Sequence, residues 1–253
     1  MSQDFDAIVI GAGAAGLMCA MTAGARGRRV LLLDHADAPG KKILISGGGR
    51  CNFTNTEAAA DRFISANPHF ARAALARYTQ HDFLGLVGKH GIAWHEKTLG
   101  QLFCDGSARE ILRMLLDECA AGGVDMRMGH RVSDVSGGEG FRVETDHGGF
   151  TARALVLASG GLSIPKMGAT GFAHDVAGRF GLPVVPPLPG LVPLTFGAAD
   201  LALMQPLAGV ALDVRAVAGR SEKRRARFEE AALFTHRGMS GPAILQISSY
   251  WQA

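Results

Sequence analysis

The sequence predicts an α/β protein whose core is a Rossmann-like dinucleotide-binding domain built on a parallel sheet. The apolar run at 7–10 is typical of a buried strand, and the pattern Gly-x-Gly-x-x-Gly follows it at once. An alanine-rich stretch at 17–25 consists of good helix formers, and a second apolar strand at 30–33 runs into Asp34. Asp34 comes about 20 positions after Gly11, the spacing at which an acid meets the ribose in dinucleotide-binding folds.

Each residue of this opening has a physical task in holding a dinucleotide. Gly11 permits the tight turn, Gly13 lets the backbone approach a pyrophosphate, and Gly16 lets the helix pack close to the strand. Free N–H groups at the helix N-terminus, where Ala14 and Ala15 stand, attract the phosphates. Asp34 accepts hydrogen bonds from the ribose hydroxyls and repels a 2′-phosphate. The alternative is a glycine-rich structural turn in an ordinary α/β domain.

Composition indicates a globular protein with a sizeable core and argues against a polyanionic partner. The chain has 253 residues, 47% of them hydrophobic, and a formal net charge of only +3. The basic run at 220–227 lies between two strand-like stretches, so a solvated hairpin loop is favoured over a nucleic-acid patch. We therefore expect a small-molecule substrate and no nucleic-acid partner, and the sequence does not indicate an oligomeric state.

Cysteine usage and hydropathy predict a cytoplasmic protein without a membrane segment. None of the four cysteines forms a CxxC pair or a zinc-type spacing, so no metal site is expected. Cys19 and Cys119 fall within predicted helices, where a buried free thiol is usual. The first strand leaves no room for a signal peptide, and no apolar run approaches the length of a membrane-spanning helix.

A second glycine-rich stretch, Ser46-Gly47-Gly48-Gly49-Arg50-Cys51-Asn52, offers N–H donors on a backbone that a ligand can approach closely. Together with its flanks it spans 40–55 and resembles the signature of the BaiN-like flavoproteins, which are described as NAD(P)/FAD-dependent oxidoreductases or aminoacetone-oxidase-family FAD-binding enzymes. The resemblance implies FAD as the dinucleotide and places the loop 46–52 beside the flavin. We also expect cofactor contacts from His35, Lys41 and Lys42.

The segment 57–122 is predicted to be mostly helical, with one short strand pair. Ser107 and Glu110 form a capping-box pattern that begins a helix ending near Gly122. The other expected elements are helices at 70–78 and 83–90 and strands at 92–95 and 101–104. The titratable cluster His95-Glu96-Lys97 is interpreted as surface residues at a strand end, without metal spacing.

Strands at 124–129, 131–135, 141–145 and 149–152, separated by glycine-rich turns, predict a three-stranded antiparallel meander after a further buried strand. Such a meander is the crossover of two-dinucleotide-binding-domain-like flavoproteins, and the resemblance implies that backbone near Val132 meets the adenine. The next strand, 154–158, ends in Ser159-Gly160-Gly161, which resembles the second glycine motif of these flavoproteins. A simple strand-to-loop turn is the alternative.

A proline-rich stretch predicts a domain boundary near Gly190, with the FAD-binding domain at 1–189 and the first part of an inserted β-rich substrate domain at 190–253. Strands are expected at 191–196, 209–218 and 227–234. Ser240 as N-cap and Pro242 in the first turn begin the last helix, and His236 is interpreted as a loop residue. Members of the resembling family continue beyond this point.

The resulting hypothesis is an FAD-dependent oxidoreductase that passes a hydride between flavin N5 and a small organic substrate. Conjugated double-bond reduction and amine oxidation both stay open, and NAD(P)H is expected as a transient reductant that docks without its own Rossmann site. Arg50 is the candidate for stabilising negative charge near the flavin or the substrate. The alternative is a truncated, non-catalytic FAD- or ADP-binding fragment. A flavoprotein acting on tRNA is less favoured, because the net charge is low and the basic run is short.

Overall fold

The computed structural model describes residues 4–219 and 225–251. The chain divides into two compact units, Met1–Val184 and Val185–Ala253, which are treated separately below. The boundary predicted at 189/190 lies in the same proline-rich stretch. In the part of the chain that the structure describes, no helix has the length and apolar character needed to cross a membrane.

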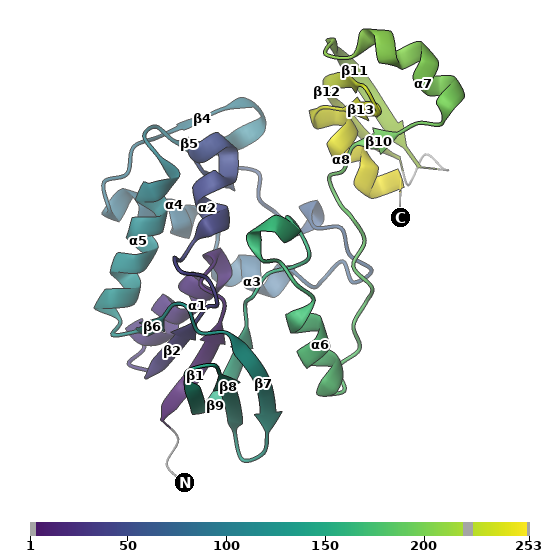
Figure 1. The fold of residues 1–253 in the computed structure, drawn as a ribbon. Helices are drawn as coiled ribbons and strands as arrows, with labels where there is room; N and C mark the ends of the chain where they lie inside the picture. The colour runs from purple at the N-terminus through teal and green to yellow at the C-terminus, as the bar shows by residue number, and fades with distance from the viewer. Residues whose placement is uncertain (1–3, 220–224, 252–253) are drawn as a thin grey trace. The chain divides into compact units, whose positions relative to one another are not determined.

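The larger unit is organised around a six-stranded sheet with the order β6-β2-β1-β9-β8-β7 (Figure 1). Strands β6, β2, β1 and β9 run parallel, and β9, β8 and β7 form the antiparallel meander. Their bounds are β1 Phe5–Ile10, β2 Val30–Leu33, β6 Asp125–Arg127, β7 Val132–Gly137, β8 Phe141–Thr145 and β9 Gly148–Leu157. The predicted α/β class, parallel sheet and meander crossover are confirmed.

In the six-stranded sheet, strand β9 differs from the expectation. The predicted strands at 149–152 and 154–158 are a single strand, β9, which leaves the meander and enters the parallel sheet without a break. Ala152 pairs with Phe141 of the antiparallel neighbour and with Phe5 of the parallel one. The two predicted strands are separated only by Arg153, which is no turn former, so the backbone stays extended.

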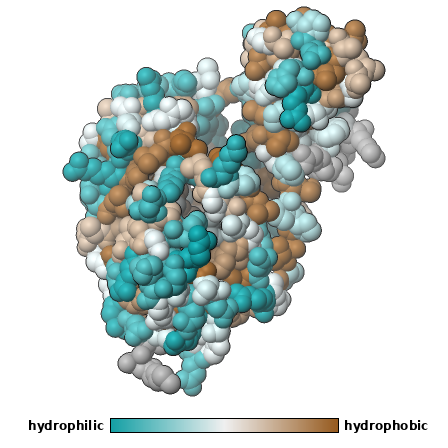
Figure 2. All heavy atoms as spheres, in the orientation of Figure 1, coloured by the Kyte–Doolittle hydropathy of each residue, from teal (hydrophilic) through white to brown (hydrophobic). Residues whose placement is uncertain are grey.

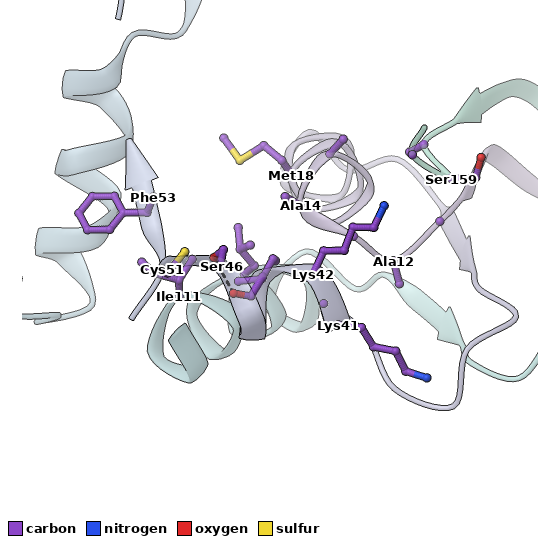
Figure 3. A pocket seen from close by; sticks show the side chains of 18 of the residues that line it. Ala12, Ala14, Met18, Lys41, Lys42, Ser46, Cys51, Phe53, Ile111 and Ser159 are labelled. Atoms are coloured by element: carbon purple, nitrogen blue, oxygen red, sulfur yellow. Dashed lines mark hydrogen bonds between the residues drawn. The ribbon is translucent and has the colours of Figure 1, made fainter. Parts of the chain in front are cut away.

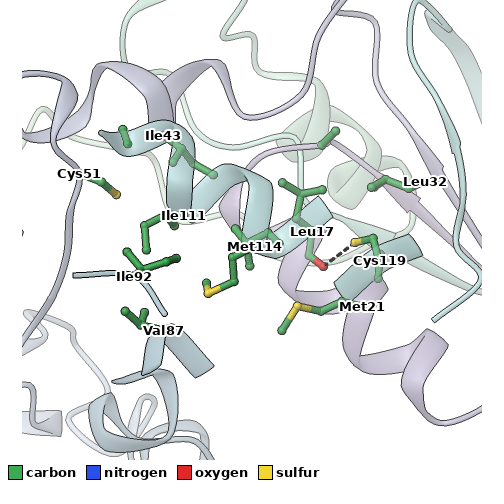
Figure 4. Packing of buried hydrophobic residues seen from close by; sticks show 14 of the residues in the cluster. Leu17, Met21, Leu32, Ile43, Cys51, Val87, Ile92, Ile111, Met114 and Cys119 are labelled. Carbon is green, nitrogen blue, oxygen red and sulfur yellow. Dashed lines mark hydrogen bonds between the residues drawn. The ribbon is translucent and has the colours of Figure 1, made fainter. Parts of the chain in front are cut away.

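Both faces of β2 and of the second half of β1 are buried, which explains why residues 30–33 and 7–10 are apolar throughout rather than alternating. On one face, helices α1 (Ala14–Ala25) and α5 (Ala108–Ala121) contribute Leu17 and Met114 to a cluster with Val9 and Leu32 (Figure 4). On the other face, Ile8, Ile10, Leu31 and Leu33 pack with Val135, Val143 and Val176 of the meander and of α6 (Phe172–Arg179). In the view of Figure 2, apolar residues of this unit gather in a band over α2 and α5.

The segment 57–122 is less helical than predicted. Besides α5, the chain between β2 and β6 forms the helices α2 (Lys41–Ile45), α3 (Arg72–Arg77) and α4 (Gln80–Lys89), and the strands β3 (Asn52–Asn55), β4 (Trp94–Glu96) and β5 (Gln101–Cys104). These strands form a small antiparallel sheet with the order β3-β5-β4, in which β3 was not predicted. Short 3-10 turns lie at Ser46–Gly49, Ala60–Arg62 and Thr98–Gly100 in this part of the chain, and a further one follows β9 at Pro165–Met167.

Helix α4 begins three positions before the predicted 83–90 helix, because Thr79 and Asp82 form a capping box at its N-terminus. The capping box predicted for α5 is present: Ser107 caps the helix and Glu110 Oε2 accepts the Ser107 N–H at 2.9 Å. The helix predicted at 70–78 is shorter, Arg72–Arg77.

The smaller unit is a four-stranded antiparallel sheet of order β10-β13-β12-β11, against which helix α8 (Pro242–Trp251) packs. The strands are β10 Leu194–Thr195, β11 Ala211–Ala218, β12 Ala226–Thr235 and β13 Gly238–Ser240, and helix α7 (Ala198–Met204) and a 3-10 turn (Gln205–Leu207) lie between β10 and β11. Ser240 was predicted as the cap of α8, but it ends β13, and Gly241 precedes the helix. Of the predicted basic loop, residues 220–224 lie outside the described residues, and Ala218 pairs with Ala226 across it.

Candidate cofactor site

A cavity of about 740 Å³ opens in the larger unit where the parallel strands end (Figure 3). It is lined by segments that follow β1, β2 and β9, namely 11–15, 34–36 and 158–160. In open α/β sheets ligands bind in the crevice outside the carboxyl ends of the strands. The cavity therefore lies where the sequence predicts the dinucleotide.

The glycine turn has the geometry that a bound pyrophosphate requires. Gly11 has φ +113°, and a Cβ there would lie 2.4 Å from the Ala158 carbonyl oxygen. A Cβ at Gly16 would lie 1.7 Å from the Gly11 carbonyl oxygen, so only glycine lets α1 approach β1 this closely. A Cβ at Gly13 would meet no other atom within 4 Å, so there is open space at the start of α1. No side chain among the described residues caps this helix, so its first N–H groups are free to bind an anion.

Asp34 faces the cavity and is held in place by backbone donors. Its Oδ2 accepts the Ala12 N–H at 2.7 Å, and its Oδ1 accepts the Ala36 N–H at 2.8 Å. The imidazole Nδ1 of His35, which also lines the cavity, lies 3.4 Å from Oδ1. Each carboxylate oxygen can accept a further hydrogen bond, so Asp34 can both order the glycine turn and bind a ribose.

Another part of the cavity wall is formed by α2 and the loop after β9, which a lysine side chain connects. The Lys42 Nζ donates to the Ser163 carbonyl oxygen at 2.9 Å and to its Oγ at 3.0 Å. Ser159 and Gly160 line the cavity beside it, with Gly160 in the left-handed region at φ +82°. Lys41 also lines the cavity, but its Nζ lies 2.6 Å from Asp37, and Figure 3 shows its side chain turned away from that of Lys42.

The glycine-rich loop predicted beside the flavin contributes only in part. Ser46, Cys51 and Asn52 line the cavity. Gly47, Gly48, Gly49 and Arg50 do not, and neither do Gly16, Val132 and Gly161. The glycines have φ of +56°, +66° and +87°, and a Cβ at Gly47 would lie 2.6 Å from the Asn52 nitrogen. These glycines therefore shape the turn that presents Ser46 and Cys51, while the exposed Arg50 lies outside the lining.

Sequence reasoning missed an apolar extension of the cavity. Phe53 and Phe83, whose ring centroids lie 6.0 Å apart, line it together with Leu75 and Tyr78. Met18, Ala58, Thr79, Gln80, Ile111 and Leu115 complete this part, and Met167, Gly168 and Ala169 close the end near His35. The only available signal was the apolar periodicity of the helices, which indicates a buried face but not which cavity it lines.

The other cysteine, histidine and acidic side chains are of the types that bind metal ions in proteins. Among residues 4–219 and 225–251, no three His, Cys, Asp or Glu side chains could share a metal ion. The four cysteines are free, and burial raises the pKa of Cys104 to about 12 and that of Cys119 to about 11. His95 pairs with Asp105 at 2.7 Å on the partly exposed β4–β5 hairpin, and His236 is exposed between β12 and β13.

Comparison with known proteins agrees with this geometry: the model of the HI0933-like protein Rossmann domain matches residues 5–239. The chain belongs to the HI0933-like family. The matched family model describes a Rossmann domain, so the resemblance to BaiN-like flavoproteins is supported at the level of the fold.

Three curated relatives of this HI0933-like chain are informative. A protein of Escherichia coli named "Ribosomal RNA dihydrouridine synthase" is 54% identical over 251 residues, covering 99% of this chain and 62% of the relative. A protein of the same name from Haemophilus influenzae is 46% identical, covering 100% of this chain and 63% of the relative. The "3-dehydro-bile acid delta(4,6)-reductase" of Clostridium scindens is 29% identical, covering 96% and 59%. The chain thus spans about three-fifths of the length of these relatives.

Proposed function

We propose that the cavity binds the ADP half of FAD. The supporting observation is the coincidence, at one sheet edge, of a glycine turn with open space at Gly13, an uncapped helix N-terminus and the positioned carboxylate of Asp34. The diphosphate would lie on the N-terminus of α1, and the ribose on Asp34. Ser46, Cys51 and Asn52 would face the remainder of the cofactor.

We further propose that the complete protein reduces an activated carbon–carbon double bond, and that the substrate is the uracil ring of a uridine in ribosomal RNA. The printed names of the two relatives at 54% and 46% identity support this substrate. Bound FAD supplies a hydride from its reduced ring, and saturation of the uracil 5,6 double bond consumes that hydride and one proton. NAD(P)H, the proposed reductant, would return the flavin to its reduced state.

Arg50, which is exposed and lies outside the cavity lining, stays the proposed stabiliser of negative charge near the flavin or the substrate. Hydride addition to a conjugated ring places charge on the carbonyl oxygen, which a guanidinium can stabilise. Arg50→Ala is expected to slow turnover and to leave the FAD content unchanged. Turnover equal to that of the unmodified protein removes Arg50 from the reaction.

A direct experiment uses the purified full-length protein. FAD content is measured first, followed by anaerobic titration with NADH and with NADPH while the flavin absorbance is followed. The reduced protein is then incubated with ribosomal RNA transcribed in vitro, and nucleosides from a nuclease digest are analysed by mass spectrometry. We expect bleaching of the flavin and a uridine product heavier by two hydrogens.

The outcomes separate the alternatives. A colourless protein that binds ADP but not FAD supports the non-catalytic fragment. A flavin that is reduced and then reoxidised by a free enone, but not by RNA, supports the small-molecule substrate and the absence of a nucleic-acid partner that the low net charge predicts. Both of those expectations stay predictions, as does the cytoplasmic location.

A further inference from the structure

The segment 61–78 presents an unusual set of apolar side chains to solvent. Phe63 is 54% exposed, Phe70 80% and Tyr78 40%, and Ile64 between them is 56% exposed. The segment begins within the 3-10 turn at Ala60–Arg62 and ends directly after α3. Large rings exposed together on one short segment are typical of a binding surface.

Three arginines lie within two positions of these rings in the sequence. Arg62, Arg72 and Arg77 are exposed, and Asp61 is the only acid of the segment. Asp61 Oδ1 lies 4.0 Å from the Arg62 guanidinium, whereas Arg72 and Arg77 have no ion-pair partner among the described residues. The surface therefore combines stacking platforms with unpaired guanidinium groups.

The same segment borders the candidate cofactor cavity. Leu75 and Tyr78 line it, and so do Thr79 and Gln80, which follow directly. The Gln80 side chain donates to the Thr56 carbonyl oxygen at 2.9 Å and so anchors the end of the segment to the loop after β3. Tyr78 also borders a second cavity of about 590 Å³ along α1, whose lining includes Arg26 and Arg28.

We infer that residues 61–78 dock a single-stranded stretch of RNA, with bases stacked on Phe63, Phe70 and Tyr78 and phosphates bound by Arg72 and Arg77. Interleaved aromatic rings and arginines are the chemistry by which proteins hold unpaired strands, since every base has a face that stacks and every nucleotide carries a charge. A base turned out of such a strand could enter the adjoining cavity. The inference rests on the proposed function, because it names the surface by which an RNA substrate reaches that site.

The test measures binding apart from turnover. A fluorescent, uridine-containing single-stranded oligoribonucleotide is titrated with the FAD-loaded full-length protein, and anisotropy gives Kd at several salt concentrations. The double variant Arg72→Ala/Arg77→Ala is expected to raise Kd about tenfold and to make the salt slope shallower by about 1.4, for two lost phosphate contacts on a single strand. Phe70→Ala is expected to weaken binding at least about fivefold through lost stacking.

Matched controls separate local from general effects. Arg109→Ala/Arg153→Ala removes the same charge from two exposed arginines elsewhere in the larger unit and should leave Kd within about twofold. Arg72→Lys/Arg77→Lys retains the charge and should keep the salt slope. Phe70 is so exposed that its truncation should not unfold the protein, which FAD content and circular dichroism verify.

The results distinguish this surface from the proposed function. If the protein forms dihydrouridine but the Arg72/Arg77 and Phe70 variants bind RNA normally, the docking surface is wrong and the function stands. If RNA binds at this surface and no dihydrouridine forms, the docking surface stands and the proposed function is wrong. Failure of the unmodified protein to bind the oligoribonucleotide overturns the inference. Equal loss of binding in the Arg109/Arg153 control also overturns it, because net charge alone would then explain the affinity.

Discussion

Replacement of Asp34 by asparagine tests the core of the site, because the carboxylate has two tasks. It orders the glycine turn through the N–H groups of Ala12 and Ala36, at 2.7 and 2.8 Å, and it faces the cavity where a ribose is proposed. Asparagine has nearly the same shape but offers one acceptor and one donor. Whichever way the amide turns, one backbone N–H then points at an NH₂ group.

The size of the expected loss of stability in Asp34→Asn follows from the burial of these groups. Ala12 is 1% exposed and the Asp34 side chain 16%, so a backbone donor left without an acceptor is not rescued fully by water. An unsatisfied buried donor costs about 1–3 kcal/mol, and the loss of charge weakens the remaining bond by about 1 kcal/mol. We therefore expect Asp34→Asn to lower the free energy of unfolding by about 2–4 kcal/mol. A charge-assisted bond to the ribose is worth about 1.5–3 kcal/mol, so Kd for FAD should rise by about 10- to 100-fold.

Urea denaturation without added FAD gives the first quantity, and quenching of flavin fluorescence gives the second. Asp37→Asn is the control, since the Asp37 side chain is 85% exposed and its partner is Lys41, so that little change is expected. Unchanged stability in Asp34→Asn would mean that the two backbone hydrogen bonds contribute nothing. An unchanged FAD affinity would refute the ribose-binding role of Asp34, whatever the effect on folding.

Three further predictions concern packing, pH and thiol reactivity. Gly16→Ala should lower the free energy of unfolding by about 3 kcal/mol or prevent folding, because its Cβ would lie 1.7 Å from a backbone oxygen. Gly85→Ala, in an exposed turn of α4 with open space, should instead stabilise the protein by about 0.5–1 kcal/mol, and equal effects of the two variants in thermal unfolding contradict this. Hydrogen bonds from Lys89 and then His90 lower the pKa of Glu118 below its ordinary 4.5, so the stability they confer is complete above pH 4.5 and is lost as the pH falls through the lower pKa of the folded state. Between pH 7 and pH 3.5 the free energy of unfolding should therefore fall less in Glu118→Gln than in the unmodified protein, and identical falls argue against the pairing. Cys104 is buried and has a pKa raised to about 12, so iodoacetamide at pH 8 should label it only after unfolding. Mass spectrometry locates the label, and rapid labelling of Cys104 in the native protein contradicts its burial.

The nucleotide half of the site could be predicted because its signals are local. The strand, glycine turn, helix, second strand and acid follow one another within the first 34 residues, and each has a composition that suits one conformation. The start of α4 was also open to prediction, since Thr79 and Asp82 form a capping-box pattern in the sequence. Only tertiary pairing joins Asn52 to Phe103, about 50 residues away, and makes β3 a strand.

By itself, the sequence determined the fold class, the position of the first crossover and the need for glycine at Gly11 and Gly16. These follow from hydrophobic period and from backbone conformations that other residues cannot adopt. The tertiary structure alone decided that Lys42 reaches Ser163, that Arg50 stays outside the lining, and that Leu75, Tyr78 and Phe83 extend the cavity. The physical reason is that a cavity is formed where distant segments converge, and the direction of each side chain is set by packing rather than by its neighbours in the chain.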